Sequence, residues 1–407
     1  MTLTRLAALS LAGAMLCAAS PAPKAKSFDR ALWKADFQRV KAGLAQGYAN
    51  LDWQIEKRAF NLVRADSQIS AMLDKASSDV EAVVIFYRLV DAFHDPHLQL
   101  LPGPPPETAS LLPRQSSIEP IAAADTCSNA PYSDKKPTTS LPYAKAAEWR
   151  QVTPGPFQAG LLGNVGVIRI PSFDEQHYLT ACRAVAKPGM EGRDLQLATR
   201  AELNRQLIAL IGQLRSQGMT KLAIDISGNG GGSEWSSEVA AMLATGTLKR
   251  TAPRLVGPSC DRSVLWKGEK ACPVYAKDAE TEELKGTGVW TGPLAVLVDR
   301  RSASASEELV TWLKDNDRAM IAGERTYGAG CGYVDGGSAI TLKAAPLHIM
   351  VPNCSRYTRD GINEVEGIPP NVAVDWMTLK PQESAAALAG LFRSYTATGA
   401  EMCGCGS

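Results

Sequence analysis

The stretch PLAVLVDRRSASASEELVTWLKDN, residues 293–316, places an apolar strand, a turn of small residues and a helix in direct succession. Residues 293–298 are apolar without interruption, which is typical of a strand buried on both faces. Residues 306–316 then carry apolar side chains at helical spacing. A strand that turns directly into a helix is the repeating unit of an α/β fold.

The same alternation continues on both sides of this stretch. Further strands and helices are predicted at residues 165–170 (strand), 195–217 (helix), 221–226 (strand), 235–243 (helix), 319–322 (strand) and 348–351 (strand). Strands that alternate with helices predict an α/β core built on a largely parallel sheet.

The residues before this core have a different character. Residues 31–46 and 80–92 have apolar side chains three and four positions apart, which predicts amphipathic helices between residues 28 and 92. Residues 102–163 are rich in Pro, Ser, Thr and Ala and are expected to be irregular. A segment of this length is expected either to cover another part of the protein or to form a small subdomain.

The turn Ser302-Ala-Ser304-Ala-Ser-Glu307 has two interpretations. A hydroxyl at the start of a helix lies beside free backbone N–H groups, which suit the oxyanion of an acyl-transfer reaction. Ser304 and Glu307 also form the Ser-x-x-Glu pattern of a capping box, whose only role is to begin a helix. Spacing alone favours the cap.

A glycine-rich turn, Gly230 to Gly232, follows the predicted strand 221–226. A phosphate-binding loop is one interpretation, but the Lys-Ser/Thr ending of a P-loop and a spaced GxGxxG are both missing. The better interpretation is close approach of the backbone to a scissile carbonyl. Gly231 and Ala305 would then donate their N–H groups to the oxyanion.

Four sequence blocks, in this order, resemble those of peptidase family S41, which includes C-terminal-processing and tricorn-like proteases. They are VGVIRIPSF at 165–173, IDISGNGGG at 224–232, SASASE at 302–307 with GERTYG at 323–328, and a closing block with GIPPNV at 367–372. The resemblance implies a crotonase-like α/β spiral core with a helical N-terminal domain. It also implies Ser304 as the nucleophile.

On this basis the chain divides into five segments. They are a signal peptide (1–25), a helical N-terminal domain (26–101), an irregular connection (102–163), the S41 core (164–380), and a C-terminal helix with a Cys-containing tail (381–407). No PDZ domain is recognisable before the core, so peptide capture by β-augmentation is not predicted.

The sequence departs from the processing proteases at the catalytic base. Their Ser–Lys dyad takes its lysine from a T-[YF]-G-K-G block, where this chain has Ala329. Alanine cannot accept a proton. Tricorn-like members use a histidine from before the core, and Asp95-Pro-His97 matches their D-x-H motif. His97 is therefore the predicted general base, with turn formation as its alternative role.

The resemblance places the residue that orients this base at Glu364, with Glu366 as a close rival. Ser227 stands where the family usually has Arg. His94 is expected to be structural, and the two other histidines lie outside any motif of this kind.

The balance of charged residues narrows the classes of binding partner that the sequence predicts. The 407 residues carry 43 basic and 42 acidic side chains, so neither nucleic acid nor an anionic membrane is a predicted partner.

After Cys17 the cysteines are Cys127, Cys182, Cys260, Cys272, Cys331, Cys354, Cys403 and Cys405. This even number predicts disulfides in an exported chain. There are two plausible local bridges, Cys260–Cys272 and Cys331–Cys354, and other pairings are open. The spacing of cysteines and histidines that is typical of a zinc site is missing.

The first residues are typical of an export signal. Arg5 precedes an apolar run over residues 6–19 that is too short to span a bilayer comfortably, and small residues follow. Cleavage is expected between residues 19 and 25. Leu16 before Cys17 argues against a lipid anchor, and no later segment is predicted to cross a membrane.

The sequence therefore predicts a periplasmic or secreted serine endopeptidase or carboxyl-end-processing peptidase. It would hydrolyse peptides or proteins through an acyl-enzyme on Ser304, with His97 as base and no cofactor. One alternative is an inactive S41-fold protein that binds hydrophobic ligands, as the related retinoid-binding repeats of the interphotoreceptor protein do. The other alternative is an esterase.

Overall fold

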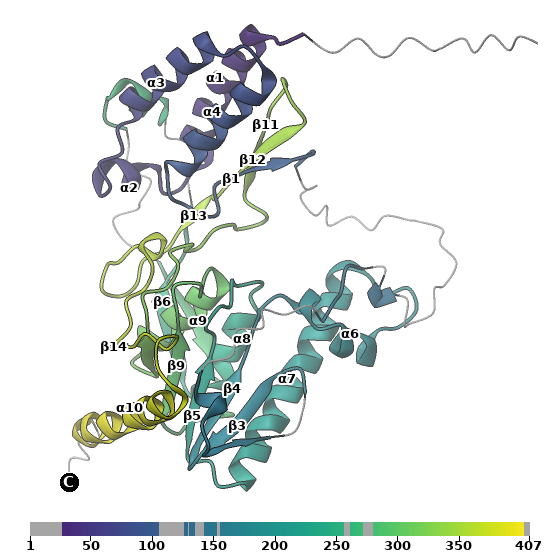
Figure 1. Ribbon diagram of the computed structural model, residues 1–407, viewed down its shortest axis with the longest axis vertical. Helices are drawn as coiled ribbons and strands as arrows, with labels where there is room; N and C mark the ends of the chain where they lie inside the picture. The colour runs from purple at the N-terminus through teal and green to yellow at the C-terminus, as the bar shows by residue number, and fades with distance from the viewer. Residues whose placement is uncertain are drawn as a thin grey trace, which may run out of the picture.

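The computed structural model describes residues 27–105, 126–128, 130–134, 142–152, 155–255, 261–271 and 280–402. They form two lobes (Figure 1): one holds the N-terminal helices and a small sheet, and the other holds a large sheet with its helices. The predicted signal peptide, the predicted Cys260–Cys272 bridge, Cys403 and Cys405 lie outside the described residues.

The large sheet has the strand order β14-β10-β9-β5-β4-β3-β2. Its parallel part consists of β4 (Val165–Arg169), β5 (Lys221–Asp225), β9 (Leu294–Val298), β10 (Met320–Gly323) and β14 (Val372–Ala373). Two antiparallel strands, β3 (Gln158–Leu162) and β2 (Trp149–Gln151), extend the β4 edge. The predicted mixed α/β fold with a largely parallel sheet is confirmed.

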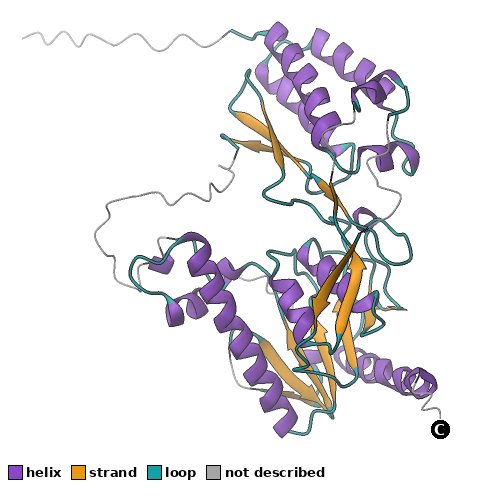
Figure 2. Ribbon diagram, turned by 180° about the vertical axis from the view of Figure 1, so that it is seen from behind, coloured by secondary structure: helices purple, strands orange, loops and turns teal. Residues whose placement is uncertain are grey.

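Helices lie on both sides of this sheet (Figure 2), and both of its faces are buried. On one face, alternate side chains of β9 pack with α7 (Gly192–Ser216), α8 (Trp235–Met242) and α9 (Ala305–Lys314). On the other face, Ala295 and Leu297 pack with α10 (Pro381–Met402). Successive strand residues point to opposite faces, so a strand covered on both sides needs an uninterrupted apolar run.

The N-terminal lobe combines segments that are far apart in sequence. Its helices are α1 (Arg30–Gly47), α2 (Leu51–Glu56), α3 (Leu62–Lys75) and α4 (Asp79–Asp91). They pack on the three-stranded sheet β1-β12-β11, which consists of β1 (Gln99–Pro102), β12 (Leu347–Val351) and β11 (Ser338–Thr341). The chain after β10 therefore crosses between the lobes, and the segment 324–337 lies at the crossing.

Smaller elements complete the described chain. Two strand pairs are β6 (Thr247–Thr251) with β8 (Thr281–Lys285), and β7 (Arg254–Leu255) with β13 (Cys354–Ser355). A short helix, α6 (Leu179–Val185), packs on α7.

Two expectations about strands need correction. The segment 102–163 is not irregular throughout, because β2 and β3 lie in it and join the large sheet. Gly160 makes this pairing possible, since any side chain there would collide with the ring of Trp149. The predicted strand 348–351 exists as β12 but belongs to the small sheet of the N-terminal lobe.

Two disulfides are present among the described residues. Cys331 and Cys354 form the bridge predicted from their spacing. Cys127 and Cys182, whose pairing the sequence left open, form the second and attach a short segment to α6. No helix in the described ranges has the length and apolar character needed to span a bilayer.

Candidate active site

Ser304 occupies a strained position at the start of α9. Its φ of 56° and ψ of −117° are rare for a residue with a side chain, so the surrounding packing has to hold them. Ser302 and Ser306 are fully buried, and their hydroxyls donate to the carbonyls of Ile226 and Asn229, both at 2.9 Å. Ser304 is the partly exposed serine of this turn and lines a cleft.

The glycine-rich turn after β5 lies directly against the turn that carries Ser304. The Asn229 carbonyl accepts the Ala303 N–H at 3.0 Å. Gly231 has a φ of 104°, and a Cβ placed on it would lie 2.7 Å from the Ser304 Cβ. Only glycine allows the two turns to approach so closely.

Two residues that line this cleft have a backbone N–H group without an acceptor among the described residues. They are Ala305, in the first turn of α9, and Gly232. Gly231, the second donor predicted from the sequence, donates its N–H to Asn229 Oδ1 at 2.9 Å. The Gly231 N–H is therefore already paired, whereas those of Ala305 and Gly232 are not.

The buried carboxylate of Glu307 connects the turn of Ser304 to the segment 326–330. Its donors are the hydroxyl of Thr326 at 2.6 Å and the backbone N–H groups of Ser304 (3.0 Å), Gly328 (2.8 Å), Ala329 (2.9 Å) and Gly330 (3.0 Å). Burial raises the pKa of Glu307 to about 7, although these hydrogen bonds oppose the rise. One side chain thus sets where Ala329 lies relative to Ser304.

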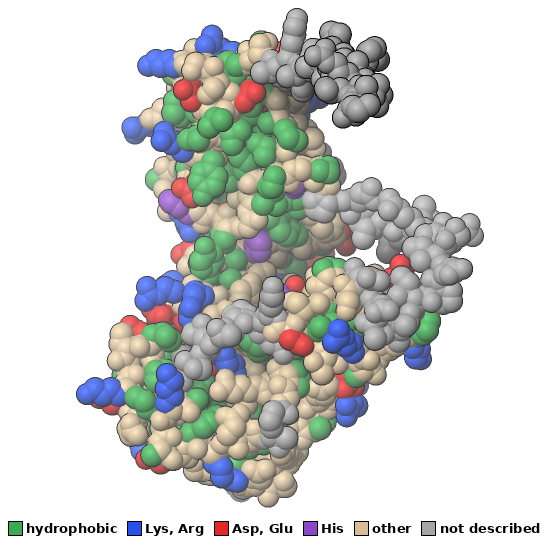
Figure 3. Space-filling view, turned by 45° about the vertical axis from the view of Figure 1, so that its right-hand side comes forward, with side chains coloured by type: hydrophobic (Ala, Val, Ile, Leu, Met, Phe, Trp, Pro, Cys, Tyr) green, Lys and Arg blue, Asp and Glu red, His purple; other side chains and the backbone are tan. Residues whose placement is uncertain are grey.

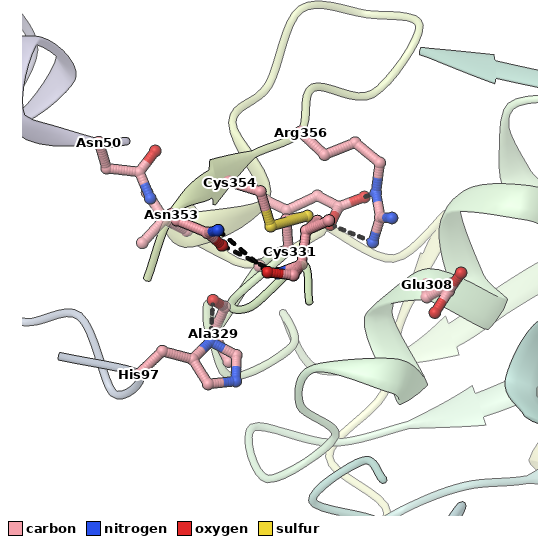
Figure 4. Close-up of a disulfide and its surroundings, with 12 residues drawn as sticks. Asn50, His97, Glu308, Ala329, Cys331, Asn353, Cys354 and Arg356 are labelled. Carbon is pink, nitrogen blue, oxygen red and sulfur yellow. Dashed lines mark hydrogen bonds and ion pairs between the residues drawn. A yellow bond between two sulfur atoms is a disulfide. The ribbon is translucent and has the colours of Figure 1, made fainter. Parts of the chain in front are cut away.

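His97 lies in the loop between α4 and β1. The carboxylate of Asp95 accepts the His97 backbone N–H at 3.0 Å and so shapes the loop. The imidazole Nδ1 lies 2.8 Å from the carbonyl oxygen of Ala329 (Figure 4). Because a carbonyl can only accept, Nδ1 carries a proton, and in the neutral imidazole the lone pair is therefore on Nε2. This is the tautomer that a general base requires at Nε2.

His97 and Ser304 line the same cleft of about 500 Å³. No hydrogen bond joins the two side chains in the part of the chain that the structure describes. The structure therefore brings the predicted nucleophile and base into one cleft, without a hydrogen bond between them.

The other three histidines are placed elsewhere. His94 is exposed and lines a different groove. The Nδ1 of His177 lies 2.8 Å from Ser172 Oγ, and the Nδ1 of the buried His348 lies 2.9 Å from the Gly103 carbonyl. Of the four histidines in the sequence, only His97 shares the cleft with Ser304.

Comparison with known families assigns the core of this chain. The model described as "Peptidase family S41" matches residues 164–374, just over half of the 407 residues. The chain belongs to peptidase family S41. The match contains Ser304, the glycine-rich turn and the segment 326–330, whereas His97 lies before it.

Curated S41 relatives match over short stretches. The chloroplastic C-terminal processing peptidase of Tetradesmus obliquus is 31% identical over 159 residues, which cover 37% of this chain and 30% of that protein. The carboxyl-terminal-processing protease of Picosynechococcus sp. (strain ATCC 27264 / PCC 7002 / PR-6) is 29% identical over 134 residues, or 32% and 27% of the two chains. The chain thus spans less than a third of the length of these relatives.

Solved structures match over nearly the whole chain. Mature CPAF has a TM-score of 0.59 at 14% identity, covering 88% of this chain and 96% of that one. Mature CPAF complexed with lactacystin has a TM-score of 0.58 at 13% identity, covering 90% and 98%. At such low identity these matches show that the fold is shared.

In this S41 site, neither of the two residues predicted to orient the base, Glu364 and Glu366, is hydrogen-bonded to the His97 imidazole. The fully buried Glu364 accepts hydrogen bonds from Arg356 Nε at 2.7 Å, Arg356 Nη2 at 2.9 Å and the Thr311 hydroxyl at 2.7 Å. Glu366 is exposed and lines the groove that contains His94. The group that contacts the His97 ring nitrogen is instead the Ala329 carbonyl.

Ser227 lies beside a buried ion pair. Arg169 of β4 donates to Asp225 at 2.6 Å and to the Ser227 carbonyl at 2.7 Å. The buried carboxylate of Asp225 is therefore paired, as a buried charge must be.

One wall of the cleft contains a charged network around Glu308. Burial alone would raise the pKa of this carboxyl, but the guanidiniums of Arg250 and Arg356 outweigh it and lower the pKa to about 2. Arg250 Nη2 lies 2.8 Å from the Glu308 carboxylate. A folded-state pKa below the unfolded value stabilises the protein above about pH 4.5, and this contribution is lost as the pH falls toward 2.

Replacing Glu308 with glutamine is therefore expected to lower the free energy of unfolding by about 3 kcal/mol near pH 7, and by less at pH 3.5. Urea denaturation at both pH values measures this difference. The exposed Glu283 of β8 is a matched control, since its glutamine variant should stay within about 0.5 kcal/mol. An equal loss for the Glu308 variant at both pH values would contradict the assigned ionisation.

Sequence reasoning missed the role of Glu307 in arranging the site. The Ser-x-x-Glu spacing was visible, and the Glu307 carboxylate does accept the Ser304 N–H, as in a capping box. Its other donors come from residues 326–330, about twenty positions downstream. No local pattern indicates that these residues fold back onto it.

Proposed function

We propose that this S41 protein is a serine peptidase in which Ser304 is the nucleophile and His97 is the general base. Ser304 Oγ attacks the peptide carbonyl while His97 Nε2 takes the hydroxyl proton. His97 then returns this proton to the leaving amine, which leaves an acyl-enzyme on Ser304. Water, activated by the same imidazole, releases the acyl group.

The main support is the shared cleft of Ser304 and His97, together with the tautomer that the Ala329 carbonyl imposes. The N–H groups of Ala305 and Gly232 would bind the oxyanion. Because Glu364 is held by Arg356, the proposal gives the orienting role to the Ala329 carbonyl. The missing hydrogen bond between base and nucleophile would form when substrate closes the cleft, as catalytic contacts often do.

The substrate in this proposal is a peptide or protein, cut internally or near its carboxyl end as the names of the curated relatives suggest. The protein would act in the periplasm or outside the cell. The N-terminal apolar run and the two disulfides support export.

Labelling with a fluorophosphonate tests this function directly, because the reagent forms an adduct only with an activated serine. Wild-type protein should be labelled, mass mapping should place the adduct on Ser304, and Ser304→Ala should abolish both labelling and the hydrolysis of unfolded protein substrates. An unlabelled wild-type protein, or an adduct on another serine, would refute the assignment. Parallel assays with ester substrates separate a peptidase from an esterase.

A second function is favoured by one feature, a groove of about 620 Å³ beside α4 and β1, whose lining mixes charged side chains with exposed hydrophobic ones. Hydrophobic side chains gather on the N-terminal lobe in Figure 3, and among those lining this groove Tyr87 and Tyr327 are 60% and 56% exposed. A catalytically inactive S41 protein could bind a hydrophobic ligand there. Tight binding of an apolar fluorophore that survives Ser304→Ala, with no hydrolysis by wild-type protein, would support this function instead.

A further inference from the structure

The segment 329–333 contacts His97 on several sides. The Ala329 carbonyl accepts from Nδ1, and the Tyr333 hydroxyl donates to the His97 carbonyl. The rings of His97 and Tyr333 lie 5.1 Å apart between centroids. Between these contacts, Gly332 lies so close that a Cβ on it would be 2.6 Å from His97 Cε1. The position of the imidazole therefore depends on where this segment lies.

This segment has no helix or strand of its own, so other contacts must hold it. Upstream, Glu307 holds the N–H groups of Ala329 and Gly330. Downstream, the Val334 N–H donates to Asn353 Oδ1 at 2.9 Å, and Asn353 Nδ2 donates back to the Val334 carbonyl at 3.0 Å.

Between these two anchors, the disulfide from Cys331 to Cys354 attaches the segment covalently to β13 (Figure 4). Cys354 is fully buried in β13, whereas Cys331 is partly exposed and lines the cleft that contains Ser304 and His97. The bridge therefore joins the segment that contacts the imidazole to the buried strand β13, and its Cys331 end lines the cleft.

We propose that the Cys331–Cys354 disulfide positions His97, so that hydrolysis depends on the oxidised state of this bridge. The inference rests on the proposed function for its activity readout. Without the bridge, the anchors at Glu307 and Asn353 keep the segment attached, but the residues between them gain freedom. Misplacement of a base by about 1 Å is enough to lower a rate by roughly 100-fold.

Reduction is a two-electron thiol exchange. A thiolate of a small dithiol attacks the Cys331 sulfur, the S–S bond breaks, and Cys354 leaves as a thiolate that takes a proton. The second thiol of the reductant then closes its own disulfide and releases Cys331 as a thiol. The protein gains two protons and two electrons, and the dithiol is oxidised.

The experiment compares Cys331→Ser/Cys354→Ser with Cys127→Ser/Cys182→Ser, which removes the other described disulfide. The first variant is expected to react with fluorophosphonate roughly 10- to 100-fold more slowly than wild type, and the second within about twofold. Circular dichroism confirms that each variant is folded. If the first variant does not fold, dithiothreitol reduction and reoxidation of a variant that retains only Cys331 and Cys354, with the other cysteines replaced by serine, gives the same comparison.

A readout independent of activity is the imidazole ¹⁵N NMR spectrum, with the His97 signals assigned from a His97→Asn variant. Loss of the Cys331–Cys354 bridge should shift the His97 Nδ1 signal, while loss of Cys127–Cys182 should leave it unchanged. Unchanged His97 signals and labelling rates without the bridge would overturn this inference and leave the proposed function intact. If wild-type protein is never labelled but the His97 signals shift, the proposed function fails and the positioning role stands.

Discussion

Replacing His97 with asparagine is expected to lower kcat for peptide hydrolysis by about 10²–10⁴-fold. The asparagine amide can still donate a hydrogen bond to the Ala329 carbonyl, which His97 Nδ1 contacts at 2.8 Å. It has no equivalent of the Nε2 lone pair and cannot take the proton of Ser304. The loss should therefore fall on kcat, and the free energy of unfolding should change little. Steady-state hydrolysis and urea denaturation measure the two quantities.

His94 provides the matched control for this variant. It lies three residues earlier in the same loop, is exposed, and faces the groove beside α4. His94→Asn should keep kcat within about twofold. If His97→Asn retained wild-type kcat, or if both variants lost activity equally, His97 would not be the base.

Replacing Glu307 with glutamine is expected to lower the free energy of unfolding by about 3 kcal/mol and to slow fluorophosphonate labelling by about 100-fold. The carboxylate accepts the Thr326 hydroxyl and several backbone N–H groups, including those of Ser304 and Ala329. A glutamine amide turns its own N–H groups toward these donors, so buried donors lose their acceptor. The segment that holds His97 would then move away from Ser304.

Denaturant unfolding and the labelling rate, measured on the same preparation, separate the two effects. Glu366→Gln is the control, because Glu366 is exposed and should change stability by no more than about 0.5 kcal/mol. A Glu307→Gln protein with wild-type stability and labelling would show that this carboxylate does not organise the site.

Most regular elements of the core could be predicted from local patterns. The run from Leu294 to Val298 is apolar at every position because both faces of β9 are covered, and the structure has a parallel strand there. Glycines in the turn after β5 likewise indicated close approach of the backbone to a scissile carbonyl, and the structure shows Gly231 lying against Ser304. These signals are local, since they depend on burial or backbone freedom at single positions.

Other parts of the fold and site have no such local signal. Ser302, Ser304 and Ser306 look alike in sequence, and only tertiary packing buries the outer two while leaving Ser304 at the cleft. The strand pair β2 and β3 was missed because its pairing depends on the fit between Trp149 and Gly160.

The His97 contact with Ala329 joins residues 232 positions apart, and the donors of Glu307 converge from a separate segment. The amino-acid sequence alone established the family blocks, the order of strands and helices, and two candidate side chains, because burial periodicity and motif spacing are properties of the chain itself. The placement of those side chains in one cleft was decided by the crossing of the chain between the two lobes. A contact between distant residues depends on the packing of all the elements between them.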